Sequence, residues 1–220
     1  MVGDTQAQPL AGDARIVYGA RRSWRVEIGS KVVWRGTGDI TPSKDGRLVT
    51  ASRVGFDVTD GARVHIRTGC VAGARRGSTW YVLCGAARSP WVGVLRGGKV
   101  RVLGPPLGTS VRSGWFGWYT SAEVSPDGQT LLLQYSGQCE TPNAFFEPVS
   151  GGRPRPVTGE ADWRTAPESS AIGWMRDGWA LVRLLPFACG QGARPGIYAI
   201  SPAGGMRRLA RVNAEPWGRW

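Results

Sequence analysis

Short apolar segments alternate with polar, glycine-containing turns along most of the chain. The dipeptide Asp-Gly occurs at Asp45-Gly46, Asp127-Gly128 and Asp177-Gly178, each time between two such segments. Asp-Gly in this setting is a strong hairpin signal, because glycine accepts the positive φ that a tight turn between strands requires. Residues 130–135 and 179–184, which follow the last two copies, are rich in strand-forming side chains. The pattern therefore predicts repeated β-hairpins.

A second glycine turn follows each of the first ones, at Asp60-Gly61, Gly97-Gly98, Gly151-Gly152 and Gly204-Gly205. One unit then reads as a four-stranded antiparallel meander, and five units in 220 residues give about 44 residues each, a period typical of propeller blades. The strands are expected at residues 15–18, 24–28 and 31–34; 38–41, 48–52, 55–58 and 63–67; 70–74, 80–84, 91–95 and 99–103; 121–125, 130–135, 144–149 and 153–157; and 171–175, 179–184, 196–200 and 206–209.

Such a unit cannot bury its faces alone, and radial stacking solves this problem. We therefore predict an all-β fold, a β-propeller with five blades of four-stranded antiparallel meanders; a β-sandwich is the alternative. Residues 1–13 are polar and small and are expected to be a disordered arm, so 14–220 form the single propeller domain. The first unit lacks a visible fourth strand, and residues 211–220 are expected to help close the ring against it.

The segment Val124-Ser125-Pro126-Asp127-Gly128-Gln129-Thr130-Leu131 resembles the signature of TolB-type propeller repeats, which are WD-repeat-like. Residues 41–46 and 175–178 match it in part. The resemblance covers the repeat architecture of most of the chain and implies a propeller. Members of this repeat class are often periplasmic or secreted, and some serve as the non-catalytic propeller beside a peptidase domain. Because the motif is a turn device, it indicates the fold and carries almost no information on function.

The four cysteines bear on the compartment. Cys70 and Cys84 lie seven residues either side of Gly77, the turn of a hairpin, and opposed positions of this kind are close enough for a disulfide. Cys139 and Cys189 each lie eleven residues after the glycine of their own Asp-Gly turn, in equivalent loops of adjacent blades. The repeat register favours the pairs Cys70 with Cys84 and Cys139 with Cys189, and four free thiols are the alternative.

No apolar run approaches the 18 residues of a membrane-spanning helix, and residues 1–13 do not resemble a secretory signal. With the predicted disulfides, the expected location is extracellular, periplasmic or cell-envelope associated, with any export signal already removed.

The net charge of +12 raises the question of nucleic-acid binding. Only Lys31, Lys44 and Lys99 are lysines, and the arginines that make up the other basic residues are spread along the chain. A site that follows phosphates gathers such residues on one face, so nucleic acid is not the expected partner. The charge does predict affinity for anionic surfaces and polymers of the cell envelope.

The sequence contains few candidate catalytic residues. His65 is the single histidine and lies in an alternating strand, and no nucleophile elbow, metal-binding pair or phosphate-binding glycine loop is present. We therefore expect no enzymatic activity, no cofactor and no metal. A propeller glycosidase with paired carboxylates is the alternative. Its candidates are Glu123, Glu140, Glu147, Glu160, Asp162 and Glu168.

The two faces of the predicted disk differ. The first and third turns of every blade are tight and point to one face, while the middle loops and the linkers between blades are longer and point to the other. Binding residues tend to lie on long loops held by a rigid scaffold. The long-loop face is also aromatic, and aromatic side chains beside arginine suit protein hot spots or sugar stacking. The predicted binding residues are Trp115, Phe116, Trp118, Tyr119, Asp162, Trp163 and Arg164.

The leading hypothesis is a non-catalytic binding propeller that presents this face to a protein partner. Carbohydrate or anionic-polymer binding is the second hypothesis. For Trp118 and Trp163, packing over the core between blades is an equally good interpretation.

Overall fold

The computed structural model describes residues 7–85, 89–105, 117–137, 142–160, 166–185 and 194–211. In this part of the chain, twenty β-strands and one short 3-10 helix, η1 (Ala20–Arg22), are present. The strands form five antiparallel sheets of four, and strands that are neighbours in sequence are hydrogen-bonded neighbours in each sheet. The prediction of an all-β fold with five blades of four-stranded meanders is confirmed.

Each sheet is one blade, and the blades are numbered in chain order. Blade 1 consists of β1 (Ala7–Pro9), β2 (Ala14–Tyr18), β3 (Ser23–Ile28) and β4 (Lys31–Thr37). Blade 2 consists of β5 (Ile40–Pro42), β6 (Leu48–Ala51), β7 (Val54–Asp57) and β8 (Arg63–His65). Blade 3 consists of β9 (Cys70–Arg76), β10 (Thr79–Cys84), β11 (Trp91–Arg96) and β12 (Lys99–Val102). Blade 4 consists of β13 (Gly117–Val124), β14 (Thr130–Gly137), β15 (Pro142–Pro148) and β16 (Arg155–Pro156). Blade 5 consists of β17 (Ser169–Trp174), β18 (Ala180–Leu184), β19 (Gly196–Ile200) and β20 (Met206–Arg211).

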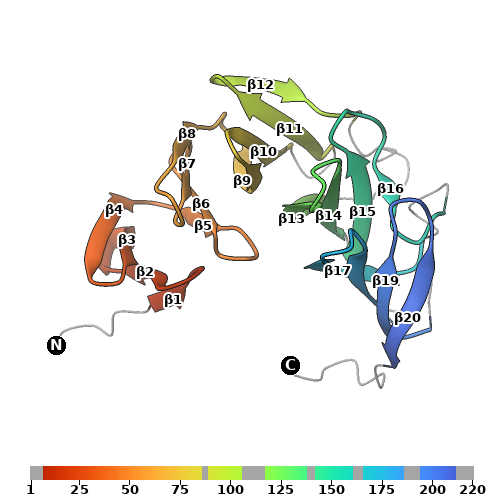
Figure 1. Ribbon diagram of the computed structural model, residues 1–220. Helices are drawn as coiled ribbons and strands as arrows, with labels where there is room; N and C mark the ends of the chain where they lie inside the picture. Colours follow the sequence, from red (N-terminus) through yellow and green to blue (C-terminus); the bar gives the residue numbers. More distant parts are fainter. Residues whose placement is uncertain are drawn as a thin grey trace.

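The blades stand side by side in an arc around a common centre (Figure 1). The first strand of each blade lies nearest the centre and the fourth lies at the rim, as in a propeller. The arc has an open sector between blade 1 and blade 5 (Figure 1). Among the described residues, no hydrogen bond, ion pair or hydrophobic core joins these two blades.

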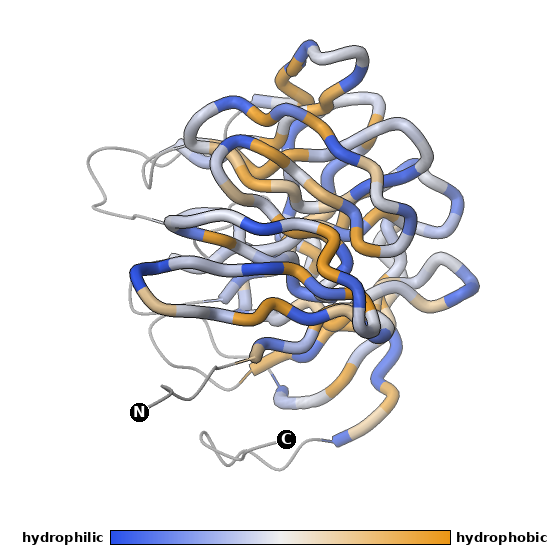
Figure 2. The backbone as a smooth tube through the Cα atoms, turned by 90° about the vertical axis from the view of Figure 1, so that its left-hand side faces the viewer, coloured by the Kyte–Doolittle hydropathy of each residue, from blue (hydrophilic) through white to orange (hydrophobic). Residues whose placement is uncertain are grey.

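Four hydrophobic cores hold the described blades together, one between each pair of neighbours. In blade 4, Leu131 and Leu133 face blade 3 while Leu132 faces blade 5, so all three are buried. A strand that is buried on both faces is apolar throughout instead of alternating, which explains the run of leucines. Figure 2 shows the hydrophobic residues gathered along the strands and the hydrophilic ones at many of the turns.

The tight first turns of blades 2 and 4 are built in the same way. In blade 4, Ser125 Oγ donates a hydrogen bond of 2.5 Å to Asp127 Oδ1 and accepts one of 3.0 Å from Thr130 N. Asp127 Oδ1 also accepts from Gln129 N, and Gly128 has a φ of 79°. These bonds fix a side-chain-supported turn that requires glycine at one position. Blade 2 repeats each bond with Ser43, Asp45, Arg47 and Leu48.

Blade 5 departs from this arrangement because Met175 stands where the other two blades have serine. Trp174 pairs with Ala180, whereas in blade 4 Val124 pairs with Leu131, so the connection in blade 5 is one residue shorter. A shift of one residue exchanges the two faces of a strand. As a result Ala180 and Val182 face blade 4, although alignment on the Asp-Gly dipeptide would turn them away from it.

The N-terminal segment differs from the prediction. Residues 7–13 are not a disordered arm, because Ala7–Pro9 pairs antiparallel with β2 and completes blade 1. The strand that the predicted first unit lacked is therefore β1, which comes from this segment and not from the C-terminal tail. Of the predicted tail, Arg211 is the last residue of β20, and residues 212–220 lie outside the described residues.

One hydrogen bond crosses the centre of the arc. The Lys44 ammonium, in the first turn of blade 2, donates to the carbonyl oxygen of Ala171 in blade 5. Among the side-chain hydrogen bonds between described residues, this one alone joins blades that are not neighbours in the arc. The connection between β5 and β6 projects towards the centre in Figure 1, in agreement with this contact.

Candidate functional site

The topology defines two faces of the propeller. The short-turn face carries the first and third turns of each blade, and the long-loop face carries the connections between second and third strands and between blades. By the strand bounds, the connections β10–β11 and β18–β19 are longer than the first and third turns of their own blades, and the linkers β12–β13 and β16–β17 are longer still. The predicted division into a face with tight turns and a face with longer connections therefore holds in blades 3 and 5, whereas in blade 4 the connection between β14 and β15 is shorter than both turns on the opposite face.

The structure separates the predicted aromatic residues. Trp118 lies near the start of β13, at the long-loop end of the innermost strand of blade 4, and it is 55% exposed. Trp115 and Phe116 lie outside the described residues. The same holds for Asp162, Trp163 and Arg164. Trp118 is therefore the one predicted binding residue that the described part of the chain shows as available on this face.

Tyr119 belongs to the core instead. It is 5% exposed, and its ring packs edge-on against Tyr135 and Phe145, with ring centroids 6.2 and 6.4 Å away. Burial raises the pKa of Tyr119 well above its ordinary value, and the nearby Glu147 acts in the same direction. Tyr119 points opposite to Trp118 because neighbouring residues of a strand face opposite sides. It supports the wall between blades 3 and 4 and is not part of a binding surface.

Cys70 and Cys84 form a disulfide, as predicted. They are the last pair of the β9–β10 ladder and lie at its long-loop end. The pairing depends on a β-bulge at Gly73, which shifts the register by one residue and brings Cys84 opposite Cys70. The bridge therefore holds together two strand ends on the predicted binding face. Cys139 and Cys189 lie outside the described residues.

A hollow lies beside this disulfide on the long-loop face. Its lining includes Arg67, Thr68 and Gly69 from the linker into blade 3, both cysteines, Gly85 and Trp91. Arg67 and Thr68 are exposed, and Trp91 is half-buried against the core between blades 2 and 3. An arginine and a tryptophan beside a covalently fixed backbone form the kind of rigid, mixed surface that protein partners use.

Strained arginines lie on the same face. Arg21, Arg22, Ser52 and Arg53 have φ values of 56°, 58°, 46° and 70°, and they form the connections between second and third strands in blades 1 and 2. Side chains other than glycine rarely adopt this left-handed conformation because Cβ crowds the following carbonyl. The linker before blade 3 packs beside one of these turns, because Ile66 N donates to Arg53 O at 2.7 Å.

The short-turn face uses its charges internally. The fully buried Asp57 accepts hydrogen bonds from Arg47 Nε at 3.0 Å, Arg75 Nη1 at 2.8 Å and Thr59 Oγ1 at 2.6 Å. Burial alone would raise the pKa of Asp57, but these hydrogen bonds outweigh it and lower the pKa to about 2. Since Arg75 belongs to blade 3 and lies over the Trp80 ring, the cluster joins blades 2 and 3.

The candidate carboxylates do not form a described pair. Glu123 faces blade 5, where its Oε2 would be 3.1 Å from a Cβ placed on Gly173, and burial raises its pKa against the opposing effect of Lys44. Glu147 is on the opposite side of blade 4, next to Gly104. It is 1% exposed, burial raises its pKa to about 8, and its Oε2 has no hydrogen-bond partner.

The remaining candidate carboxylates are separate from these two. Glu168 is buried, Glu160 accepts a hydrogen bond from Thr158, and Glu140 and Asp162 lie outside the described residues. Within the described ranges, no three histidine, cysteine or acidic side chains are grouped as metal ligands, and no helix is long and apolar enough to cross a membrane.

Sequence reasoning did not identify Arg53, Arg67 or Trp91 as surface residues of the site. Arg67 and Trp91 were assigned to strands, and Ser52-Arg53 carries no glycine to mark it as a two-residue turn. The predicted disulfide was the sequence feature that could have located these residues. Two cysteines that close the long-loop end of a hairpin also place the residues just before Cys70 and after Cys84 on that face.

Comparisons by sequence find no relative: no protein-family profile and no curated protein matches the chain. Solved structures do share its fold. Prolyl endopeptidases align with a TM-score of 0.53 and 9% identity, over 95% of this chain and 36% of theirs. Prolyl oligopeptidase B from Galerina marginata aligns with a TM-score of 0.52 and 11% identity, over 90% of this chain and 32% of its own. TolB from Acinetobacter baumannii aligns with a TM-score of 0.47 and 13% identity, over 93% of this chain and 51% of its own.

At these identities the comparisons show the fold alone. The propeller fold that the resemblance of residues 124–131 implies is confirmed by the five four-stranded antiparallel sheets. The chain spans about a third of the peptidase chains and about half of the TolB chain.

Proposed function

We propose that this propeller is a non-catalytic binding module and that its long-loop face binds a protein partner. The observation that carries the proposal is the hollow beside the Cys70–Cys84 disulfide, with Arg67 and Trp91 in its lining. Exposed Trp118 lies on the same face. Rigid aromatic and arginine side chains supply much of the binding energy at protein interfaces, because they bury a large area and lose little conformational entropy.

The proposal includes no catalytic role for the chain. Glu123 and Glu147 lie on opposite sides of blade 4, whereas a glycosidase requires two carboxylates that flank one bond. It also places the protein in an oxidising compartment, outside the cell or in its envelope, because disulfides persist there. Intact-mass analysis of protein from its native compartment tests the location: a Cys70–Cys84 bridge is expected, and free thiols at both positions would contradict it.

Site-specific photocrosslinking in native extracts tests the binding face. A photoreactive residue at position 67 or 118 should capture the same protein, whereas one at position 176 should not. Arg176 is the control because it is also exposed but lies on the short-turn face. Capture only from position 176 would refute the proposal. With the captured protein purified, Arg67→Ala and Trp118→Ala should each weaken its binding by about tenfold or more, and Arg176→Ala should leave it unchanged.

Binding of an anionic envelope polymer or acidic carbohydrate is the second candidate. It is favoured by the exposed Arg21, Arg53 and Arg67, none of which has an acidic partner among the described residues. Retention on purified acidic cell-wall polymer should fall steeply between low and moderate salt and should weaken further in Arg53→Ala. Retention that is independent of salt and of Arg53 would exclude this candidate.

A further inference from the structure

The face of blade 1 that points away from blade 2 borders the open sector of the arc. Two rows of side chains cross its strands: Val17, Arg25 and Arg35 form one, and Arg15, Glu27 and Val32 form the next. The opposite face of the same strands carries Ile16, Trp24 and Val26 and is buried against blade 2. The two faces of blade 1 differ because alternate residues of β2, β3 and β4 point to opposite sides of the sheet, one side facing blade 2 and the other facing the open sector.

Arginines on this face are crowded in a way that the fold itself does not require. Arg25 and Arg35 are direct partners on adjacent antiparallel strands, and like charges at such positions destabilise the pairing. The only acidic side chain in the two rows is Glu27, which is 7% exposed. It accepts a hydrogen bond of 2.5 Å from Arg25 Nε and one of 2.8 Å from Arg15 Nε. These hydrogen bonds, that of Arg25 first, lower the pKa of Glu27.

This arrangement leaves charged hydrogen-bond donors unused. Because Arg15 and Arg25 bind Glu27 through Nε, their terminal amino groups make no hydrogen bond within the described residues, and these side chains are 54% and 45% exposed. Arg35 is exposed and has neither a hydrogen bond nor an ion pair there. Three guanidinium groups and one buried carboxylate therefore present an excess of positive charge, in the geometry that binds carboxylates in pairs of hydrogen bonds.

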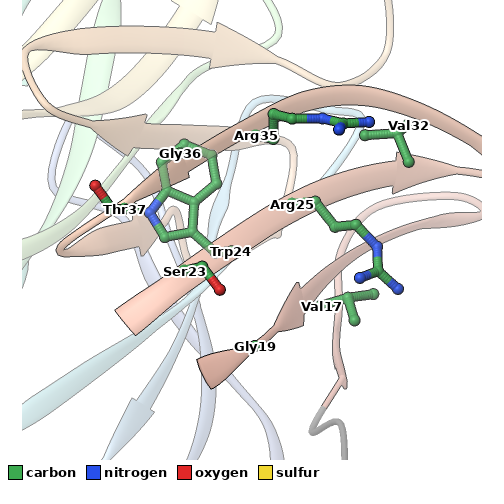
Figure 3. A pocket seen from close by; sticks show the side chains of 9 residues that line it. All are labelled: Val17, Gly19, Ser23, Trp24, Arg25, Val32, Arg35, Gly36 and Thr37. Atoms are coloured by element: carbon green, nitrogen blue, oxygen red, sulfur yellow. The ribbon is translucent and has the colours of Figure 1, made fainter. Parts of the chain in front are cut away.

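Two of these arginines, Arg25 and Arg35, line a groove. Its volume is about 590 Å³, and its lining includes Val17 and Val32 beside Arg25 and Arg35, with Gly36 and Thr37 at one end. In Figure 3 the two arginines extend along the sheet near the two valines, while the Trp24 ring lies over Gly36. The groove thus combines apolar contact surface with charged donors, which suits an extended polypeptide better than a polymer that carries only charge.

The ends of this chain do not supply the complementary charge. Strand β20 of blade 5 carries Arg207, Arg208 and Arg211 without an acidic residue, so closure of blade 5 on blade 1, or pairing with a second copy, would bring like charges together. Residues 1–6 and 212–220 contain one acidic residue each, Asp4 and Glu215. The occupant that fits is a different, acidic chain.

We propose that the open face of blade 1 is a second binding surface, independent of the long-loop face. Its occupant is an acidic polypeptide segment whose carboxylates pair with Arg25 and Arg35 and whose apolar side chains cover Val32. The segment neutralises the opposed arginines and occupies the edge of the open sector. The charges that destabilise the free sheet become the source of affinity in the complex.

Fluorescence anisotropy with two synthetic peptides tests this proposal. One peptide alternates glutamate and leucine over ten residues, and the other has glutamine in place of each glutamate. The glutamate peptide should bind at least about tenfold more tightly at low salt, and the difference should shrink at high salt. Arg35→Gln should abolish most of the difference in affinity between the two peptides. Since the Arg35 side chain has no hydrogen bond or ion pair within the described residues, this variant should fold normally.

Arg101→Gln is the matched control, because Arg101 is an exposed arginine on the outer strand of blade 3. It should leave peptide binding unchanged, and so should Arg67→Ala, which belongs to the long-loop face. Equal binding of the two peptides, or an unchanged affinity in Arg35→Gln, would overturn the proposal. Polyphosphate at an equal concentration of charge is a competitor in the same assay. If it displaces the peptide, and if replacing the leucines of the peptide leaves binding unchanged, the groove binds anionic polymers and the proposal is overturned.

Discussion

The two faces of the propeller use charged residues in opposite ways. On the short-turn face, Asp57 and Asp127 are held in hydrogen bonds that shape turns or join blades. On the long-loop face, Arg21 and Arg53 occupy strained turns, and Arg67 lies exposed beside the disulfide. The same residue types therefore stabilise the fold on one face and remain available on the other.

Removal of Asp57 should have the largest effect on stability, because it disrupts the charge cluster on the short-turn face. Asp57→Ala removes the acceptor of three side-chain hydrogen bonds and leaves Arg75, whose side chain is 11% exposed, with the half-exposed Asp60 as its carboxylate, so the free energy of unfolding should fall by about 3 to 5 kcal/mol. Urea unfolding of this variant and of Asp177→Ala, whose carboxylate is exposed, measures the difference. A loss below about 1 kcal/mol, the usual range for an exposed ion pair, would show that the cluster is not structural.

Acid should reproduce part of this loss. The pKa of Asp57 is lowered to about 2 in the fold, so its contribution is present above its unfolded pKa of about 3.8 and is lost as pH falls between these values.

Removal of the disulfide should come next and tests the opposite face. The bridge closes a loop with a sequence separation of 14, so Cys70→Ala with Cys84→Ala should lower the free energy of unfolding by about 3 kcal/mol on the chain-entropy account. Thermal unfolding measures this loss, and binding of the captured partner should weaken as well, since the hollow loses its rigid edge. Loss of stability with fully retained binding would separate the disulfide from the site.

Glu147 belongs to neither face, and its effect depends on pH. Because burial raises its pKa from 4.5 to about 8, the folded state holds a proton that the unfolded state has released in this range. Stability should therefore fall as pH rises between these values, by at most about 1.4 kcal/mol per pH unit, and level off above them. Glu147→Gln cannot ionise and should lack this slope in urea unfolding from pH 5 to pH 8. Equal slopes in both proteins would contradict this assignment.

The smallest effect should have the opposite sign. Arg53 has a φ of 70°, so Arg53→Gly relieves a left-handed conformation and should raise the free energy of unfolding by up to about 1 kcal/mol. Chemical unfolding measures the gain, with Arg101→Gly as a control that has no such strain to relieve. A gain in stability combined with weaker retention on acidic polymer would sharpen the comparison, because it would show an arginine kept at a strained position for binding.

Most of the fold could be predicted from the glycine-containing turns. Gly46, Gly128 and Gly178 all have positive φ in the first turns of their blades, and the Asp-Gly copies therefore indicated the propeller. The first strand of blade 1 was missed because Ala7–Pro9 is three residues long and includes a proline, so it has no readable alternation. Tyr119 was assigned to the surface because a single aromatic run contains both faces of β13, and only pairing with β14 separates them.

The disulfide shows how a correct prediction can rest on compensating irregularities. The β9–β10 turn has two residues, Gly77 and Ser78, and without a bulge this register would place Cys84 opposite Val71. The bulge at Gly73 removes that offset. The register of blade 5 and the opposition of Arg25 and Arg35 depend on similar single-residue shifts. Such shifts are set by packing and cannot be read from residue types alone.

The hydrogen bond from Lys44 to Ala171 has a mechanical consequence. In an open arc the four interfaces between blades act in series, so small rotations at each of them add up at the two ends. Lys44 connects blade 2 directly with blade 5 and bypasses three of these interfaces. One ammonium group thereby limits the bending of most of the arc, and the joint between blades 1 and 2 is the one interface that it does not bypass.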